Sequence, residues 1–215
     1  DPKILFSIYL YKTVVSKEHN SFFEDFAGSL IVAPSFLDPE WKVLDIGCND
    51  GTLLTYFKNL GWKVQGIEPA INLAKEVAAK GIPVINDFFP PLMELKEQYD
   101  VITAFNVFAH NNNPRFFMKE MARLLKPNGR IYILTTLGKL DSYYHEHISY
   151  FTVGSMFALV ELCGLSMRSF RETSMHGESY LFEISLPEVK QDFKELVFST
   201  LADYGNPVVG YGASA

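Results

Sequence analysis

The sequence has 215 residues, of which 48% are hydrophobic, and its 19 Lys and Arg against 25 Asp and Glu give a net charge of −6. A chain of this size and composition can bury a substantial core as one main domain. No basic block is present, so binding to nucleic acid or to an anionic membrane is not expected, and a small-molecule substrate fits better.

The two cysteines, Cys48 and Cys163, lie far apart and match neither a disulfide framework nor a zinc-site spacing. We therefore expect no metal and a reducing, cytoplasmic setting. No apolar run reaches the roughly 18 residues that a membrane span requires, and the N-terminus lacks a secretory signal pattern. The sequence leaves the oligomeric state open.

Predicted strands and helices alternate along most of the chain. Strands are expected over residues 41–47, 63–69, 83–89, 99–106 and 130–136, and helices over residues 52–61, 71–81, 91–98, 114–129 and 153–165. This alternation predicts an α/β fold with a mostly parallel sheet and helices on both faces. Two last strands, over residues 166–174 and 179–186, are joined by a glycine-containing loop and predict an antiparallel edge.

The two ends of the chain differ from this alternating centre. Residues 1–33 carry apolar side chains at mixed helical spacing, which predicts two short helices that serve as a lid or adapter. Residues 34–187 form the predicted main domain, and residues 188–215 are expected to be a helix and the start of a truncated C-terminal domain. The chain begins without a methionine and stops after "VVGYGASA", which suggests a piece of a longer protein.

Glycines and acids follow the first three predicted strands, where an open α/β sheet binds its ligands. The stretch "DIGCNDG", residues 45–51, offers glycines for close approach and two acids that suit a cationic ligand better than a phosphate. Glu68 stands where an acid can accept hydrogen bonds from ribose hydroxyls. Asp87 and Phe88 suit an adenine amine and ring. Each feature alone is equally typical of a tight turn or a helix cap.

In combination, "VLDIGCNDG", Glu68 and Asp87 resemble the class I S-adenosylmethionine-dependent methyltransferases, from about Trp41 to Leu186. The resemblance implies a Rossmann-like sheet of seven strands with S-adenosyl-L-methionine as cofactor. The glycine loop would face its methionine part, Glu68 its ribose and Asp87 its adenine amino group. The implied cofactor-binding residues are Asp45, Gly47, Asn49, Gly51, Glu68, Pro69, Asp87, Phe88 and Asn106.

The stretch "DSYYHEHISYFT", residues 141–152, gathers two histidines, two acids and three tyrosines after a predicted strand. Methyl transfer to carbon requires a base for a C–H proton and donors for the enolate oxygen, and this stretch supplies imidazoles and phenols. An aromatic-rich loop can equally be a packed lid, and His145 alone is better interpreted as a surface residue.

The pattern Tyr-x-Glu-His followed by "ISYFT" resembles, more narrowly, the sugar C-methyltransferases that act on nucleotide-activated 4-keto deoxysugars. "YLYKTVVSKE" at residues 9–18 and "HGES" at residues 176–179 match two further segments of that family, although Glu178 replaces a usual glycine. The cysteine-rich zinc module that members usually carry is absent from this sequence. The resemblance implies a nucleotide sugar as substrate, with His147 as general base. The other implied catalytic residues are Tyr144, Glu146 and His110, and the implied substrate-binding residues are Tyr9, Tyr11 and His176.

Two other functions stay open from the sequence. The same loop would serve a small-molecule O- or N-methyltransferase by positioning a hydroxyl or amine near the cofactor. A protein that keeps the fold as a non-catalytic interaction module is the third possibility, and the intact glycine and acidic motifs argue against it.

Overall fold

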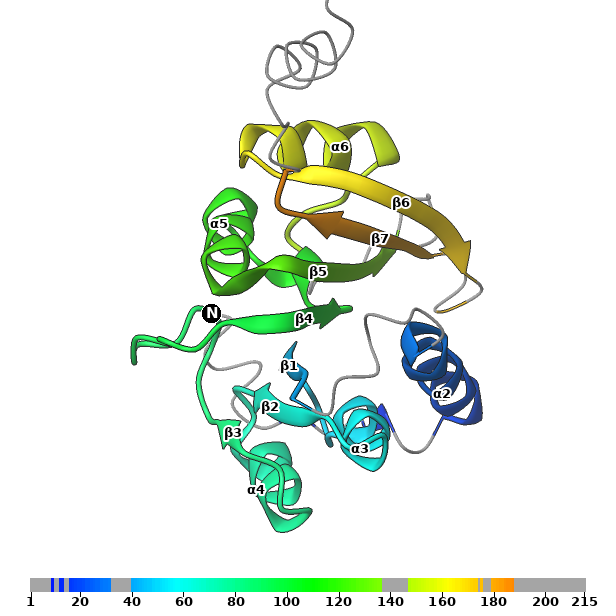
Figure 1. Cartoon of the computed structure of the whole chain (residues 1–215), viewed down its shortest axis with the longest axis vertical. Helices are drawn as coiled ribbons and strands as arrows, with labels where there is room; N and C mark the ends of the chain where they lie inside the picture. The colour runs from blue at the N-terminus through cyan, green and yellow to red at the C-terminus, as the bar shows by residue number, and fades with distance from the viewer. Residues whose placement is uncertain are drawn as a thin grey trace, which may run out of the picture.

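In the computed structural model, the chain folds around one sheet of seven strands in the order β3-β2-β1-β4-β5-β7-β6 (Figure 1). The structure describes residues 9, 12–13, 16–31, 40–136, 147–173, 175 and 179–187. The strands are β1 Lys42–Ile46, β2 Lys63–Ile67, β3 Val84–Ile85, β4 Tyr99–Phe105, β5 Leu125–Thr136, β6 Ser166–Thr173 and β7 Ser179–Ser185. The helices are α2 Lys17–Ile31, α3 Thr52–Asn59, α4 Ile71–Ala79, the short 3-10 helix η3 Phe108–His110, α5 Pro114–Leu124 and α6 Val153–Leu162.

The sheet confirms the predicted Rossmann-like class. Strands β3, β2, β1, β4 and β5 pair in parallel, whereas β7 pairs antiparallel with both β5 and β6. The antiparallel strand therefore lies one position inside the edge, and β6 forms the edge itself. Because these five strands are parallel, their carboxyl ends lie at one rim, and ligands bind in such sheets where the strand order reverses, which is here between β1 and β4.

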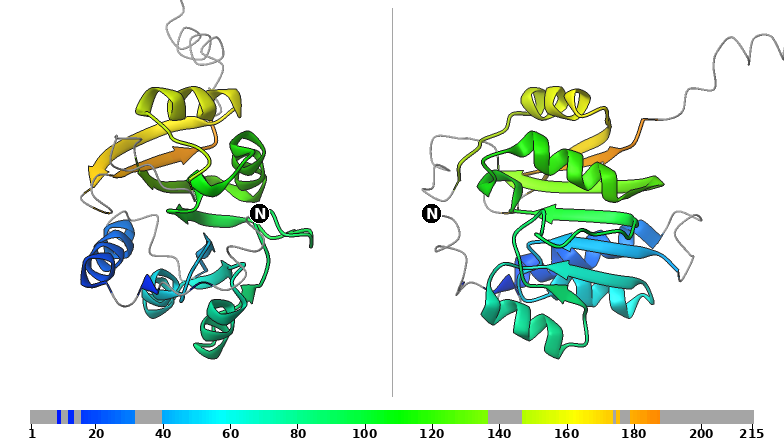
Figure 2. Two further views of the ribbon diagram at one scale, coloured as in Figure 1. Left: turned by 180° about the vertical axis from the view of Figure 1, so that it is seen from behind. Right: turned by 90° about the vertical axis from the view of Figure 1, so that its left-hand side faces the viewer.

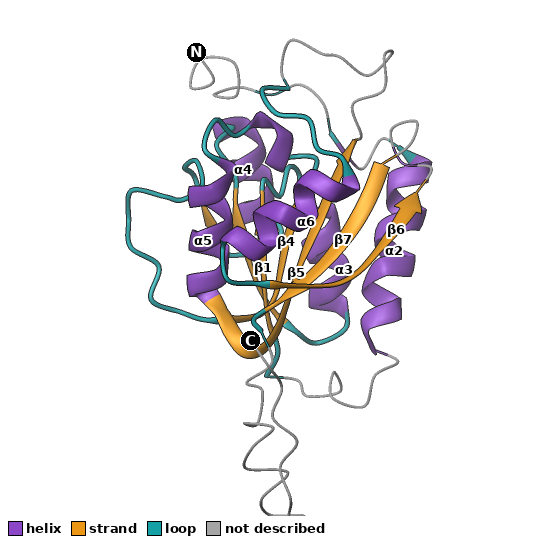
Figure 3. Ribbon diagram, turned by 90° about the horizontal axis from the view of Figure 1, so that it is seen from above, coloured by secondary structure: helices purple, strands orange, loops and turns teal. Residues whose placement is uncertain are grey.

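Helices lie against both faces of the sheet (Figures 2 and 3). Two hydrophobic cores hold them there. On one face, Phe23 and Phe26 of α2 pack with Phe57 of α3 against the central strands. On the other face, Phe117 of α5 and Met156 of α6 belong to a second core. Strand residues alternate between the two cores because successive side chains of a strand point to opposite faces.

Local signals fix the ends of two helices. The Asn113 side chain accepts a hydrogen bond from the Phe116 amide, and Pro114 occupies the first turn of α5. Thr152 and Ser155 form a reciprocal capping box at the start of α6. α5 ends at Leu124 and β5 begins at the next residue, so the strand starts earlier than the sequence pattern predicts.

The predicted helix over residues 91–98 is wrong, because this segment is irregular. Its only buried apolar side chain is Leu95, whereas Leu92 and Met93 are 99% and 61% exposed, so a helix there would have no apolar face to pack. The Asp87 carboxylate also accepts hydrogen bonds from the backbone of Phe88 and Leu92, which stabilises a turn instead. The predicted strand over residues 83–89 is reduced to the two residues of β3.

The predicted division of the chain stays a prediction. α2 is the helix that the structure describes within residues 1–33, and residues 188–215 lie outside the described residues. Within the described part of the chain, no helix combines the length and the apolar character that crossing a membrane would require.

Candidate active site

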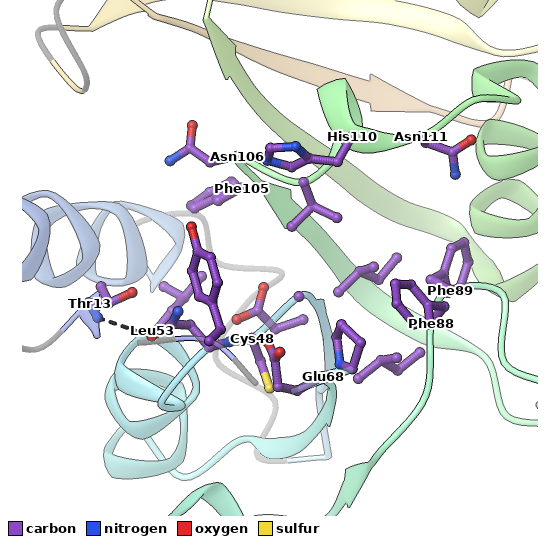
Figure 4. A pocket seen from close by; sticks show the side chains of 18 of the residues that line it. Thr13, Cys48, Leu53, Glu68, Phe88, Phe89, Phe105, Asn106, His110 and Asn111 are labelled. Carbon is purple, nitrogen blue, oxygen red and sulfur yellow. Dashed lines mark hydrogen bonds between the residues drawn. The ribbon is translucent and has the colours of Figure 1, made fainter. Parts of the chain in front are cut away.

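A cavity of about 720 Å³ lies at the carboxyl ends of β1, β2, β4 and β5 (Figure 4). Eleven of the residues predicted for the site line it: Tyr9, Asp45, Gly47, Asn49, Glu68, Pro69, Asp87, Phe88, Asn106, His110 and His147. Gly51 does not line it and begins α3 instead. The predicted site residues Tyr11, Tyr144, Glu146 and His176 lie outside the described residues.

The glycine loop after β1 is held in a conformation that suits glycine. Gly47 has a φ of 69°, and a Cβ atom on it would lie 2.3 Å from Cγ2 of Val107. The amides of Gly47 and Cys48 both donate hydrogen bonds to the carbonyl of Ile67 at the end of β2. The loop therefore packs tightly between β2 and the residues after β4, and its backbone forms part of the cavity wall.

Asp45 supplies a buried carboxyl group at the end of β1. Its Oδ1 accepts a hydrogen bond of 2.6 Å from the Thr103 hydroxyl, and its side chain is only 4% exposed. Burial raises the pKa of Asp45 to about 7, although the Thr103 hydrogen bond opposes this rise. A positively charged group in the cavity would stabilise the ionised carboxylate, so this acid suits a cationic ligand.

Glu68 is a second buried carboxyl group, and it is tied to the glycine loop. Its Oε2 accepts a hydrogen bond from the Asn49 amide at 2.8 Å, and its Oε1 accepts one from the Ala70 amide at 2.9 Å. Burial raises its pKa to about 7, whereas these two hydrogen bonds act in the opposite direction. Each carboxylate oxygen can accept more than one hydrogen bond, so Glu68 retains capacity for ligand hydroxyls.

His110 and His147 come together although they are far apart in the sequence. Their ring centroids lie 5.0 Å apart, and the ring of Tyr150 lies 5.7 Å from that of His147. The amides of Ile148 and Ser149 donate hydrogen bonds to the carbonyl of Ala109 in η3, at 2.9 and 3.0 Å. These bonds fix the segment that carries His147 against the 3-10 helix that carries His110.

Residues 9, 12 and 13, which we call the N-terminal strap, are held at the same rim by hydrogen bonds and an ion pair. The Asn72 side chain of α4 accepts a hydrogen bond from the Tyr9 amide and donates one to the Tyr9 carbonyl. Lys12 forms an ion pair of 2.6 Å with Glu76 of α4. The Thr13 amide donates a hydrogen bond of 3.0 Å to Oδ1 of Asn49, so the strap reaches the glycine loop (Figure 4).

Several of the described lining residues escaped the sequence analysis, among them His19 and Phe23 of α2 and Thr136 at the end of β5. Thr136 follows the rule that ligands meet the carboxyl ends of strands, so its position in the sequence could have revealed it. His19 and Phe23 carry no such signal, because a helix with aromatic residues at this spacing is typical of a packed core. Within the described ranges, no cluster of three potential metal ligands is found, and both cysteines are free thiols.

The fold and the rim define a class of protein, namely enzymes that bind a nucleoside-containing cofactor over a glycine loop and two strand-end acids. A family model described as "Methyltransferase domain" matches residues 21–169. The chain therefore belongs to this family, as one of the class I S-adenosylmethionine-dependent methyltransferases.

Curated relatives resemble parts of the chain. It is 26% identical over 173 residues to C-methyltransferase NovU of Streptomyces niveus, covering 75% of this chain and 41% of that protein. It is 37% identical over 107 residues to the ubiquinone biosynthesis O-methyltransferase of Pelagibacter ubique (strain HTCC1062), covering 47% of this chain and 45% of that protein. The chain thus spans less than half the length of these relatives.

Solved methyltransferases share the fold. Magnesium protoporphyrin IX methyltransferase from Synechocystis PCC 6803, with bound S-adenosylmethionine, has a TM-score of 0.64 at 17% identity and covers 79% of this chain and 80% of its own. The 1,6-didemethyltoxoflavin-N1-methyltransferase of Burkholderia thailandensis has a TM-score of 0.62 at 17% identity, covering 80% and 79%. At this identity the likeness concerns the fold alone.

Proposed function

We propose that this chain catalyses methyl transfer from S-adenosyl-L-methionine to a carbon of a nucleotide-linked keto-deoxysugar, with His147 as the general base. The observation that carries the proposal is the His110–His147 pair, whose rings lie 5.0 Å apart in the cavity that also contains Asp45 and Glu68. Imidazole titrates near neutral pH and is suited to removing a proton next to a ketone.

The rim fits the cofactor that the family uses. Asp45 and Glu68 give negative charge for the sulfonium and ammonium groups and acceptors for the ribose hydroxyls. Asp87 and Phe88 line the cavity beyond β3, where an acid and an aromatic ring suit an adenine. Gly47, Asn49, Gly51, Pro69 and Asn106 would complete the cofactor-binding set. Bound S-adenosylmethionine supplies an activated methyl group on a sulfonium centre and leaves as the neutral thioether.

The proposed chemistry of the chain is proton transfer at carbon. His147 removes the proton from the carbon next to the ketone, and the C–H electron pair forms the enolate, whose carbon then takes the methyl group as the ketone is restored. His110 lies close enough to influence the orientation of the His147 ring. Tyr144 and Glu146 would assist beside His147, and Tyr9, Tyr11 and His176 would contact the sugar.

The extent of the similarity to known enzymes also favours carbon as the acceptor. The similarity to the C-methyltransferase extends over 173 residues, whereas that to the ubiquinone O-methyltransferase extends over 107. The longer match covers 75% of this chain, whereas the shorter one covers 47%. The higher identity of the shorter match supports a second candidate, a small-molecule O- or N-methyltransferase.

Proton exchange separates the two candidates. The test incubates the protein in D₂O with S-adenosylhomocysteine and dTDP-4-keto-6-deoxyglucose, and NMR follows deuterium at the carbons next to the ketone. A C-methyltransferase exchanges one of these protons, and His147→Gln lowers the exchange rate by about 10²- to 10⁴-fold with unchanged affinity for S-adenosylhomocysteine. Full exchange by His147→Gln contradicts the base assignment, and wild-type protein that exchanges nothing but methylates a phenol supports the second candidate.

A further inference from the structure

Thr136 places a buried hydroxyl group in the wall of the cavity. It is the last residue of β5, its side chain is 6% exposed, and it lines the cavity. Its Oγ1 has no hydrogen-bond partner among the described residues. A buried hydroxyl that is left unpaired destabilises a folded protein, and a threonine can turn its hydroxyl between staggered positions to meet a ligand.

Two other threonines of the sheet show what distinguishes Thr136. Thr135 and Thr173 also have buried hydroxyls without hydrogen-bond partners in the described part of the chain, but neither lines the cavity. Thr135 points to the opposite face of the sheet, because successive residues of a strand alternate. Thr136 therefore combines an unpaired hydroxyl with access to the site, and Thr135 provides a matched comparison on the same strand.

His19 lines the same side of the cavity. Its side chain is 7% exposed, its Nδ1 lies 2.6 Å from Oγ of Ser16, and its ring meets that of Phe23 edge-on at 6.2 Å. These contacts fix the orientation of the ring. Further along α2, Phe26 packs 5.0 Å from the ring of Tyr132, which lies four residues before Thr136.

Measured from the contact between Phe26 and Tyr132, His19 on α2 and Thr136 on β5 lie at similar distances along their elements. Seven residues of helix from Phe26 to His19 rise about 10 Å, and four residues of strand from Tyr132 to Thr136 rise about 13 Å. Tyr132 and Leu134, at alternate positions of β5, belong to the core that α2 packs. Thr136 faces the same side, which defines an α2 wall made of His19 and Thr136.

The α2 wall and the 3-10 helix that carries His110 adjoin the two different cores, which we interpret as opposite sides of the cavity. Phe108, in the 3-10 helix with His110, packs in the other core together with α5 and α6. No Lys or Arg lies among the described residues that line the cavity, whereas Asp45, Glu68 and Asp87 do. A diphosphate would be repelled there, so the neutral ring of a nucleotide sugar is the part that fits between the two walls.

We propose that Thr136, oriented together with His19, binds a hydroxyl group of the sugar acceptor from the α2 wall, while His147 acts on the carbon from the opposite wall. This inference rests on the proposed function. Hydroxyl and imidazole groups match the neutral donors and acceptors of a polyol, and two contacts from opposite walls would fix which carbon of the ring meets the base.

The test compares Thr136→Val, Thr136→Ser and Thr135→Val with the wild-type chain. Calorimetry measures the binding of dTDP-4-keto-6-deoxyglucose in the presence of S-adenosylhomocysteine, and thermal unfolding is followed without ligand. Thr136→Val should weaken sugar binding about fivefold to tenfold, the loss expected for one hydrogen bond, while Thr136→Ser and Thr135→Val stay within about twofold of wild type. Without ligand, both valine variants should keep or raise the melting temperature, because an unpaired hydroxyl is removed.

Each result decides a separate point. Sugar binding by Thr136→Val within twofold of wild type overturns the inference while leaving the proposed function intact. A drop in melting temperature for Thr136→Val but not for Thr135→Val also overturns it, because the hydroxyl would then have a structural partner. Wild-type protein that binds S-adenosylhomocysteine but not the sugar overturns the proposed function and this inference with it.

Discussion

The substitution Gly47→Ala tests how tightly the glycine loop after β1 is packed. Gly47 has a φ of 69°, a region that costs an L-residue about 1–2 kcal/mol. The new Cβ would also lie 2.3 Å from Cγ2 of Val107, so either the loop or Val107 must move. Overlap of this kind in a packed site costs about 1–3 kcal/mol. The total destabilisation is therefore about 2–5 kcal/mol, or a melting temperature lower by roughly 4–20 °C in a chain of this size.

Gly61 provides the matched control for the backbone term. It has a φ of 89°, and no atom lies within 4 Å of the position its Cβ would take, so Gly61→Ala carries the conformational cost without the overlap. We expect Gly61→Ala to lose only about 1–2 kcal/mol. The difference between the two variants then isolates the contact with Val107.

Thermal unfolding of both variants, together with Gly47→Ala in a Val107→Ala background, completes a double-mutant cycle. Removing the Val107 methyl groups should make Gly47→Ala about 1–3 kcal/mol less costly than it is in the wild-type background. Calorimetry with S-adenosylhomocysteine reports whether the displaced loop still binds the cofactor product. If Gly47→Ala is no more destabilising than Gly61→Ala, the close packing of the loop against Val107 is refuted.

The buried acids and the strap give two further predictions. Burial raises the pKa values of Asp45 and Glu68 to about 7. Between about pH 4 and pH 7 the native state therefore binds more protons than the unfolded state, so the ligand-free chain loses stability as the pH rises through this window. Affinity for S-adenosylmethionine should change in the opposite direction, about tenfold tighter at pH 8 than at pH 6 if one carboxylate must ionise; equal affinity at both pH values in calorimetry would contradict this. Asn72→Ala removes both hydrogen bonds to the Tyr9 backbone and should weaken cofactor binding severalfold. Glu76→Gln changes a half-exposed ion pair and should alter cofactor binding less than twofold. Equal effects of the two variants would contradict a role of the strap in cofactor binding.

The residues that line the cavity around β1 and β2 could be predicted from sequence because their signals are local. A β-branched strand that ends in Asp45 and a glycine turn predicts both the strand and the loop, and Glu68 follows from its position after the next strand. The order of the strands in the sheet then brings Asp45, the glycine turn and Glu68 together. The structure also unites His110 with His147, which the sequence connected only through a family resemblance.

The errors concern features that depend on distant contacts. Residues 91–98 have a helical pattern of charges and apolar side chains, but no core face is available to receive Leu92 and Met93. His19 could not be recognised, because its place in the cavity depends on how α2 docks across the ends of β4 and β5. That docking is made by the contacts of Phe23 and Phe26 with Phe105 and Tyr132, which no local pattern reveals.

The contrast between local sequence signals and distant contacts also explains why the acceptor is harder to assign than the cofactor. The enzymes with the same fold are named for a porphyrin and a toxoflavin precursor, yet both have a cofactor or its product bound. At the low identity of these enzymes, their likeness to this chain concerns the fold alone. In our proposal, the walls that receive the acceptor come from α2, from the residues after β4 and from those after β5. In this chain those walls carry His19, His110, Thr136 and His147, with no Lys or Arg among the described lining residues. The keto sugar ring that we propose as the acceptor would suit these walls, because it is neutral and reacts only after losing a proton.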